Sequence, residues 1–258
     1  QFQFSEVAKI LLAVVLAHHL ATRAGELSNL RTLIGAGLIV APLLGLVLIQ
    51  PDLGTTLVFG AIMLGSLFFA GASLRWLAAT VLSVVAMIPV AWEFILRDYQ
   101  KQRLVSFLDP AADPLGSGYQ LQQSTMTVSS GGLFGRGLTN SLAGQNLPVG
   151  STDFVFAHVG EQLGFLGGSV VLALFALLIW RVLHVGWRSG DAFTLAFAGG
   201  IAGMLLFQMI INIGMVLGVM PITGIPLPFV TYGGASLLSA ALGLGILESL
   251  AMRRSRST

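Results

Sequence analysis

Long apolar runs separated by polar segments dominate the pattern of this sequence. A helix that spans a bilayer needs about 20 mostly apolar residues, and seven stretches approach or reach that length. The pattern therefore predicts an all-α polytopic membrane protein with seven transmembrane helices. We expect them at about residues 6–22, 31–50, 53–71, 74–94, 162–183, 192–218 and 234–252.

Two segments interrupt this pattern. A polar stretch at about 95–160 predicts a long loop outside the membrane. The second segment, MPITGIPLPFVTYGG from Met220 to Gly234, contains three prolines and three glycines and cannot form a continuous helix. Its other residues are mostly apolar, and such backbone at membrane depth needs protein or a water-filled cavity to cover it. We predict a re-entrant or interfacial loop, within a single membrane domain covering residues 1–258.

Composition supports a membrane protein and excludes several other classes. Hydrophobic residues make up 55% and charged residues 9% of the 258 residues, and the mean hydropathy is +0.87. Soluble domains carry roughly 25% charged residues. The net charge of +2 is too small and too scattered for nucleic-acid binding, and the lack of cysteine excludes disulfides and thiolate metal sites.

The distribution of Lys and Arg predicts the orientation in the membrane. If the chain starts outside, the inner connections carry eight basic residues and the outer side five, four of them in the long loop. This asymmetry predicts a cytoplasmic C-terminus and places most acidic residues at the outer face. The inner set is Arg23, Arg31, Arg75, Arg181, Arg188, Arg253, Arg254 and Arg256, and the outer set is Lys9, Arg97, Lys101, Arg103 and Arg136.

Asp153 and Glu161 stand where the long loop meets the fifth apolar run. Asp153 could be a helix N-cap, but no Glu or Gln follows it at the capping-box position. On one helix, Glu161 would share a side with Asp153 without forming a close pair. His158, three residues before Glu161, could join it in a metal pair, although a hydrogen-bonded His–Glu pair is the favoured interpretation.

Glu6 and Lys9 lie one helical turn apart on the first apolar run. They could be an ion pair that lowers the cost of burying both charges. Ionisable residues inside a membrane also mark substrate or ion pathways, and one couple can do both.

Further along, the break QPDLGTT places Asp52 where it suits a helix start, with Pro51 in the first turn. Gln208 and Asn212, four residues apart, suit hydrogen bonds between helices.

The long loop holds Lys101, Arg103 and Arg136 among many hydroxyl and amide groups. Arg and Lys are the residues that bind pyrophosphate or carboxylate. The stretch SSGGLFGRG also offers backbone N–H groups that could turn toward an anion. A solvated loop without a ligand is the simpler alternative.

Five segments, in order, resemble one family, the SEDS (shape, elongation, division and sporulation) proteins. They are Ser5-Glu6 with Lys9, then QPDLGTT, then the loop from Arg103 through Gln123-Ser124 to SGGLFGRG, then TDFVFAHVGEQLGFLG, and finally NIGMVLGVMPITGIPLPFVTYGGASLL. The family's essential aspartate falls on Asp153. Members typically have ten spans, so the resemblance implies that three helices precede this chain. The amino-acid sequences of the loop and of TGIPLPFVTYGG resemble those of the rod-elongation members more than those of the division members.

The resemblance implies a peptidoglycan glycosyltransferase that polymerises lipid II at the outer face of the bacterial cytoplasmic membrane. Asp153 would be the general base for the attacking sugar hydroxyl. The leaving pyrophosphate would need positive charge from Arg103, Lys101, Lys9 or a divalent cation, Mg²⁺ or Mn²⁺, held by carboxylates. Gln123, Ser124, Arg136 and Glu6 would also line the substrate site, with Asp52, His158 and Glu161 in support.

The resemblance also implies partners: lipid II, membrane lipids and a class B penicillin-binding protein. Two alternatives stay open. A lipid II flippase would suit an intramembrane Glu6–Lys9 pair, although a transporter is expected to place ionisable groups near the midplane. A non-catalytic scaffold for a cell-wall synthase predicts that Asp153 is dispensable.

Overall fold

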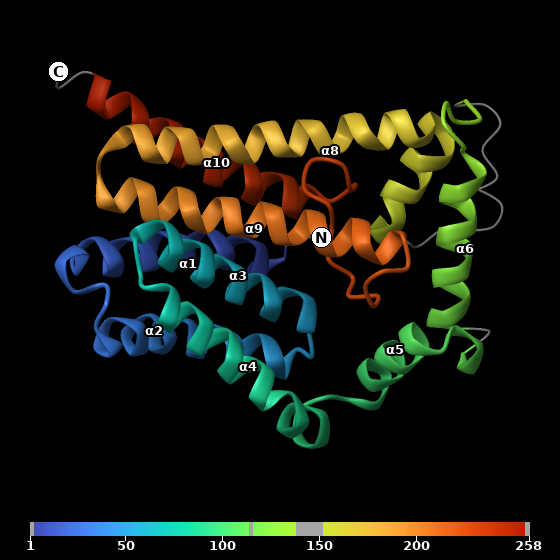
Figure 1. Cartoon of the computed structure of the whole chain (residues 1–258), viewed down its shortest axis with the longest axis horizontal. Coiled ribbons are helices and arrows are strands. Elements are labelled where there is room, and N and C mark those ends of the chain that lie inside the picture. Colours follow the sequence, from blue (N-terminus) through green and yellow to red (C-terminus); the bar gives the residue numbers. More distant parts are fainter. Residues whose placement is uncertain (1–2, 114–115, 138–151, 256–258) are drawn as a thin grey trace. The chain divides into compact units, whose positions relative to one another are not determined.

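The structure is a computed structural model that describes residues 3–113, 116–137 and 152–255. Seven long apolar helices are found in this part of the chain, which confirms the predicted all-α membrane fold (Figure 1). They are α1 (Phe4–Ala21), α2 (Leu30–Ile49), α3 (Leu53–Ala70), α4 (Leu74–Phe94), α8 (Val155–Ser189), α9 (Ala192–Val216) and α10 (Gly234–Ser255).

The expected long loop contains further helices. They are α5 (Asp98–Leu108) and α6 (Ser117–Ser130), with short 3₁₀ turns η2 (Pro110–Ala112) and η3 (Thr152–Phe154). A third 3₁₀ turn, η1 (Ala24–Glu26), connects α1 to α2. The α5 and α6 helices are too short and too polar to cross a bilayer.

The chain folds as two compact units, and α8 and α9 each contribute to both. Unit 1 comprises residues 1–95, 177–207 and 234–258, and unit 2 comprises residues 96–176 and 208–233.

In unit 1, α1 packs against α2, α3 and α10. Its buried face includes Leu12 and Leu16. The α3 and α9 helices approach closely through glycines, because a Cβ at Gly65 would meet the backbone of Gly199 and Gly203. Small residues permit such contacts between membrane helices. The α4 helix, in contrast, buries none of its residues.

Unit 2 has its own apolar core, built from α6, η3, the first part of α8, the end of α9 and the segment that follows α9. No residue from Leu217 to Gly233 is helical, as the prolines and glycines of the predicted irregular segment require. Ile222 and Leu227 of this segment belong to the core of unit 2, and Ile225 is also buried. Protein therefore covers part of the segment, as non-helical backbone among apolar helices requires, while Tyr232 is 92% exposed.

The fifth long helix departs from the expected start at residue 162. The α8 helix begins at Val155 and is interrupted at Gly164, where the backbone has φ 68° and ψ −165°. The apolar run thus predicted the part of the helix beyond the break. The earlier part was missed because His158 and Glu161 end the apolar pattern without ending the helix.

Candidate functional site

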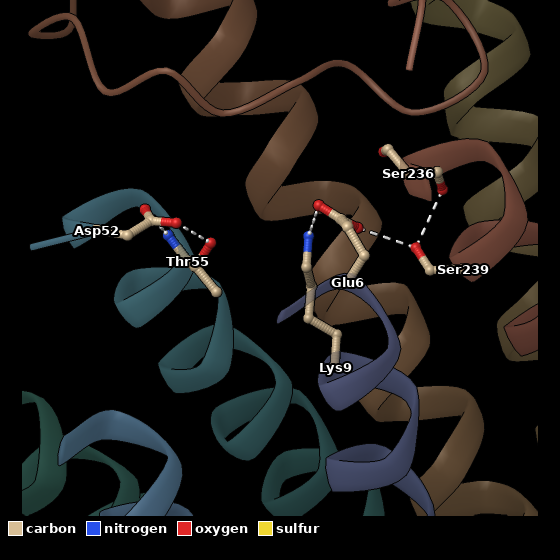
Figure 2. A network of polar contacts seen from close by, with 6 residues as sticks. All are labelled: Glu6, Lys9, Asp52, Thr55, Ser236 and Ser239. Carbon is tan, nitrogen blue, oxygen red and sulfur yellow. Dashed lines mark hydrogen bonds and ion pairs between the residues drawn. The ribbon is translucent and has the colours of Figure 1, made fainter. Parts of the chain in front are cut away.

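Glu6, Lys9 and Ser239 form a buried polar network in unit 1, which we call the ion-pair cluster (Figure 2). The Lys9 ammonium donates to Glu6 Oε1 at 2.7 Å, and Ser239 Oγ of α10 donates to Glu6 Oε2 at 2.9 Å. The same hydroxyl lies 3.0 Å from the carbonyl oxygen of Ser236. Glu6 is 4% and Lys9 1% exposed, so the predicted ion pair is confirmed and is fully desolvated.

Asp52 caps the start of α3 in the same unit (Figure 2). Its carboxylate accepts hydrogen bonds from the Thr55 backbone N–H at 2.9 Å and from the Thr55 hydroxyl at 2.7 Å. This is the helix-start role expected for Asp52. Pro51 departs from the expectation, because it precedes the cap rather than occupying the first turn of the helix.

Asp153 lies in unit 2, in the η3 turn directly before α8, and its side chain is partly exposed. Its backbone carbonyl accepts a hydrogen bond of 2.9 Å from Nδ2 of Asn212 on α9. The same Nδ2 donates to the carbonyl of Ile225 at 2.8 Å. We call Asp153, Asn212 and the segment Thr223–Ile225 the aspartate cluster.

The segment after α9 passes close to the Asp153 carboxylate. A Cβ built at Gly224, where φ is +73°, would lie 3.5 Å from Asp153 Oδ2. Arg103 of α5 reaches the same segment, because its guanidinium donates a long hydrogen bond of 3.5 Å to the carbonyl of Ile222. The Arg103 guanidinium also lies 5.7 Å from the centre of the Tyr99 ring. Unit 2 thus brings the predicted base and one predicted cation to a single irregular segment.

Several buried polar atoms of unit 2 lack a hydrogen-bond partner among the described residues. They include Asn212 Oδ1, Thr223 Oγ1 and His158 Nδ1. Buried polar atoms are normally satisfied, so such atoms in a candidate site can be reserved for a ligand or water. The expected hydrogen bond from His158 to Glu161 is not made through Nδ1. Glu161 itself is completely buried.

The SSGGLFGRG stretch has a role that differs from the predicted anion site. The N–H groups of Arg136 and Gly137 donate to the carbonyls of Glu161 and Gln162 at 2.9 and 3.1 Å. In return, the N–H of Phe165 donates to Gly132 O at 2.9 Å. These donors satisfy the backbone at the break in α8, so they do not turn toward an anion. The Arg136 guanidinium is exposed and donates to Ser130 O at 3.0 Å.

The remaining predicted contacts from the loop lie on α5 and α6. Ser124 is completely buried, and its hydroxyl donates to Val216 O at 2.9 Å, which favours a role in joining α6 to the end of α9. Gln123 and Lys101 are partly exposed. Sequence reasoning missed Asp113, whose carboxylate accepts from the Ser117 N–H at 2.8 Å and from the Ser117 hydroxyl at 3.0 Å. The backbone hydrogen bond from Ser117 is the main cause that lowers the pKa of Asp113.

Asn212 was expected to join helices, but it joins a helix to two non-helical segments. The sequence identified a buried amide in an apolar helix, and nothing in the sequence indicates which carbonyls it would meet. In the described part of the chain, no group of three or more His, Asp or Glu side chains could hold a metal ion.

Comparisons with known proteins give the family. The family model of FtsW, RodA and SpoVE, described as a cell cycle protein, matches residues 1–256. The peptidoglycan glycosyltransferase MrdB of Escherichia coli K12 is 41% identical over 98% of this chain and 69% of its own length. A probable peptidoglycan glycosyltransferase FtsW of Coxiella burnetii is 42% identical over 96% of this chain and 68% of its own length.

Solved structures agree with these sequence matches. A structure described as a peptidoglycan synthase complex that coordinates polymerization and crosslinking matches with a TM-score of 0.81 and 34% identity, over 99% of this chain and 71% of that chain. The rod shape determining protein RodA of Thermus thermophilus matches with a TM-score of 0.65 and 30% identity, over 100% of this chain and 67% of that chain. This chain therefore belongs to the family of FtsW, RodA and SpoVE, the SEDS family of peptidoglycan glycosyltransferases.

Proposed function

We propose that this protein polymerises lipid II into glycan strands at the outer face of the cytoplasmic membrane, with Asp153 as the general base. The observation that carries the proposal is the placement of the Asp153 carboxylate, which is partly exposed and lies close to Gly224, where a Cβ would be 3.5 Å from Oδ2. Its relatives are named peptidoglycan glycosyltransferases. The asymmetry of basic residues supports the outward orientation.

The reaction is a displacement at C1 of the donor sugar. The acceptor sugar hydroxyl forms the new bond to C1, and the bond from C1 to the lipid pyrophosphate breaks. Asp153 takes the hydroxyl proton, as a positioned carboxylate can. The departing pyrophosphate takes the electron pair, and its added negative charge needs a cation. One base and no neighbouring nucleophile suffice for inversion, by analogy with inverting glycosidases.

Arg103 is the cation that we assign to the pyrophosphate. It lies in the same unit as Asp153, is partly exposed and contacts the same irregular segment. Planar guanidinium groups bind phosphate oxygens in pairs. Lys9 suits this role less well, since its ammonium is buried and bound to Glu6.

A Mg²⁺ or Mn²⁺ ion that arrives with the pyrophosphate is an alternative source of positive charge. Mg²⁺ is commonly bound by one or two carboxylates together with substrate phosphates. A chelator distinguishes the two sources. If Arg103 supplies the charge, chelation leaves the rate unchanged and Arg103→Ala lowers it. Loss of activity on chelation, restored by Mg²⁺ or Mn²⁺, would assign that role to the ion.

The decisive experiment uses the full protein in vesicles with lipid II and measures glycan polymer by gel electrophoresis. We expect Asp153→Asn to lose at least about 10²-fold in rate, because general-base catalysis contributes about 10²–10⁴-fold. Glu26→Gln, at an exposed acid in the η1 turn, is the matched control and should polymerise normally. Normal polymerisation by Asp153→Asn would contradict the proposal and support a scaffold. Movement of labelled lipid II across the bilayer without polymer would support the flippase.

The partner proposed from the family is a class B penicillin-binding protein, which would crosslink the product. The solved structure titled as a synthase complex supports an assembly of this kind. The MrdB and FtsW relatives are about equally similar to this chain. We assign the protein to cell elongation and rod shape because the sequence of the TGIPLPFVTYGG segment resembles that of the rod-elongation members. Complementation of strains depleted of either protein tests this assignment.

A further inference from the structure

Asn212 joins three parts of unit 2 through one side chain. Its Nδ2 donates to the carbonyl of Asp153, 59 residues away, and to the carbonyl of Ile225, 13 residues away. We propose that Asn212 is a positioning residue, which holds the Asp153 backbone against the Thr223–Ile225 segment and so fixes where the Asp153 carboxylate lies. This inference rests on the proposed function, since it assigns the Asp153 carboxylate a chemical role.

The two carbonyls have no regular ladder of hydrogen bonds to hold them in place. Asp153 belongs to a 3₁₀ turn, and Ile225 lies within the non-helical segment between α9 and α10. A side chain that donates to both carbonyls therefore defines the distance between the two segments. The side chain of Asn212 is itself completely buried on α9, which gives the contact a rigid base.

The position of this segment matters because Gly224 is a near neighbour of the carboxylate. A Cβ at Gly224 would already touch Asp153 Oδ2 at 3.5 Å. Any relative shift of the two segments therefore moves the carboxylate with respect to the backbone beside it. A misplacement of about 1 Å can cost about 10²-fold in rate.

The chemistry of the side chain fits this role. An amide nitrogen carries two N–H donors, and both are used here on carbonyl oxygens. An aspartate would present an oxygen to the same two acceptors and repel them. This arrangement buries a polar atom at a cost in stability, because Asn212 Oδ1 has no hydrogen-bond partner in the described residues.

The kinetic test compares Asn212→Leu, Asn212→Asp and Asn212→Gln in the full protein with lipid II. We expect Asn212→Leu and Asn212→Asp to lower kcat about 10²-fold while KM stays close to the wild-type value. Asn212→Gln keeps both donors and should recover part of the rate. Gln208→Leu removes another buried amide one turn earlier on α9 and should keep the wild-type kcat.

A second readout reports the geometry without using activity. This chain has no cysteine, so the pair Asp153→Cys with Gly224→Cys can be oxidised to a disulfide without competing thiols in it. Cys at the positive φ of Gly224 is strained, but this strain is common to every variant compared, and we expect the disulfide to form more slowly when Asn212→Leu is added. Adding Gln208→Leu should leave its rate of formation unchanged. If Asn212→Leu does not fold, Asn212→Asp, which also lacks the two donors, carries the same comparison.

The outcomes separate this inference from the proposed function. If Asp153→Asn is inactive while Asn212→Leu keeps wild-type kcat and disulfide formation, the positioning role is overturned and the general base stands. If Asp153→Asn is active, the proposed function fails, and the disulfide readout alone decides whether Asn212 holds the two segments together. Equal losses of kcat in Asn212→Leu and Gln208→Leu would also overturn the specific role of Asn212.

Discussion

The two polar clusters of this protein are built in different ways. In the ion-pair cluster, side chains of two regular helices satisfy one another: Glu6 and Lys9 belong to α1 and Ser239 to α10. In the aspartate cluster, a helical side chain, Asn212, holds the backbone of two irregular segments. The first arrangement joins charges, and the second sets the position of a chain segment.

This difference indicates what each cluster contributes. A buried ion pair is costly to form and more costly to break, because removal of one partner leaves an isolated charge. We therefore expect changes in the ion-pair cluster to act first on stability. The aspartate cluster exposes part of a carboxylate and leaves Asn212 Oδ1 and Thr223 Oγ1 without hydrogen-bond partners in the described residues. Changes there should act first on the rate of glycosyl transfer.

The largest expected effect on stability is that of Lys9→Met. The substitution leaves the Glu6 carboxylate buried without its cation and should destabilise the fold by about 3–5 kcal/mol. Thermal unfolding of the protein in detergent, followed as loss of the monodisperse fraction, measures the change. The double variant Glu6→Gln with Lys9→Met removes both charges and should recover most of the loss.

If Lys9→Met instead kept its melting temperature and lost only activity, the comparison would be reversed. The ion pair would then belong to the substrate site, as the family resemblance allowed. Ser239→Ala sharpens the same point, because it removes one hydrogen bond to Glu6 while leaving the charges paired. It should destabilise by less than Lys9→Met, by about 1.5–3 kcal/mol for a hydrogen bond to a charged group.

A smaller effect on stability is expected at the glycines of the SSGGLFGRG stretch, whose backbone is hydrogen-bonded to the break in α8. Gly135 has φ +79°, and a Cβ there would collide with the backbone of Gln162. Gly132 also has a positive φ, +57°, but a Cβ there would meet no atom within 4 Å. Gly132→Ala should therefore lower the free energy of unfolding only through the strain of an alanine at positive φ, by about 1–2 kcal/mol. Gly135→Ala should lower the melting temperature further, and equal effects would argue against the contact with Gln162.

Most of the helices could be predicted from the sequence, because apolar runs of sufficient length specify membrane helices on their own. Contacts between near neighbours could also be predicted. The Glu6–Lys9 pair follows from a spacing of three residues, and the Asp52 cap follows from its place before a helix. Prolines and glycines likewise excluded a helix in the segment around Ile225. Local rules govern all of these features.

Contacts between distant segments could not be predicted from local sequence patterns. Glycines in SSGGLFGRG indicated available N–H groups, and only the folded chain shows that the N–H of Arg136 is taken by the carbonyl of Glu161. Asn212 was recognised as a buried amide, but its acceptors lie 59 and 13 residues away. The role of Asp153 stays a prediction, which rests on the family resemblance and on the placement of its carboxylate in unit 2.

The smallest expected effect concerns Asp113, a carboxylate outside both clusters. The Ser117 N–H is the main cause that holds the pKa of Asp113 below its usual 3.8. A carboxylate with a lowered pKa in the folded state adds stability above its unfolded pKa, and that stability is lost as the pH falls through the folded value. The melting temperature should therefore decline less below about pH 4 in Asp113→Asn than in the wild type. Ser117→Ala should behave between the two, because it keeps the N–H, and an unchanged pH dependence in Asp113→Asn would show that this carboxylate contributes nothing.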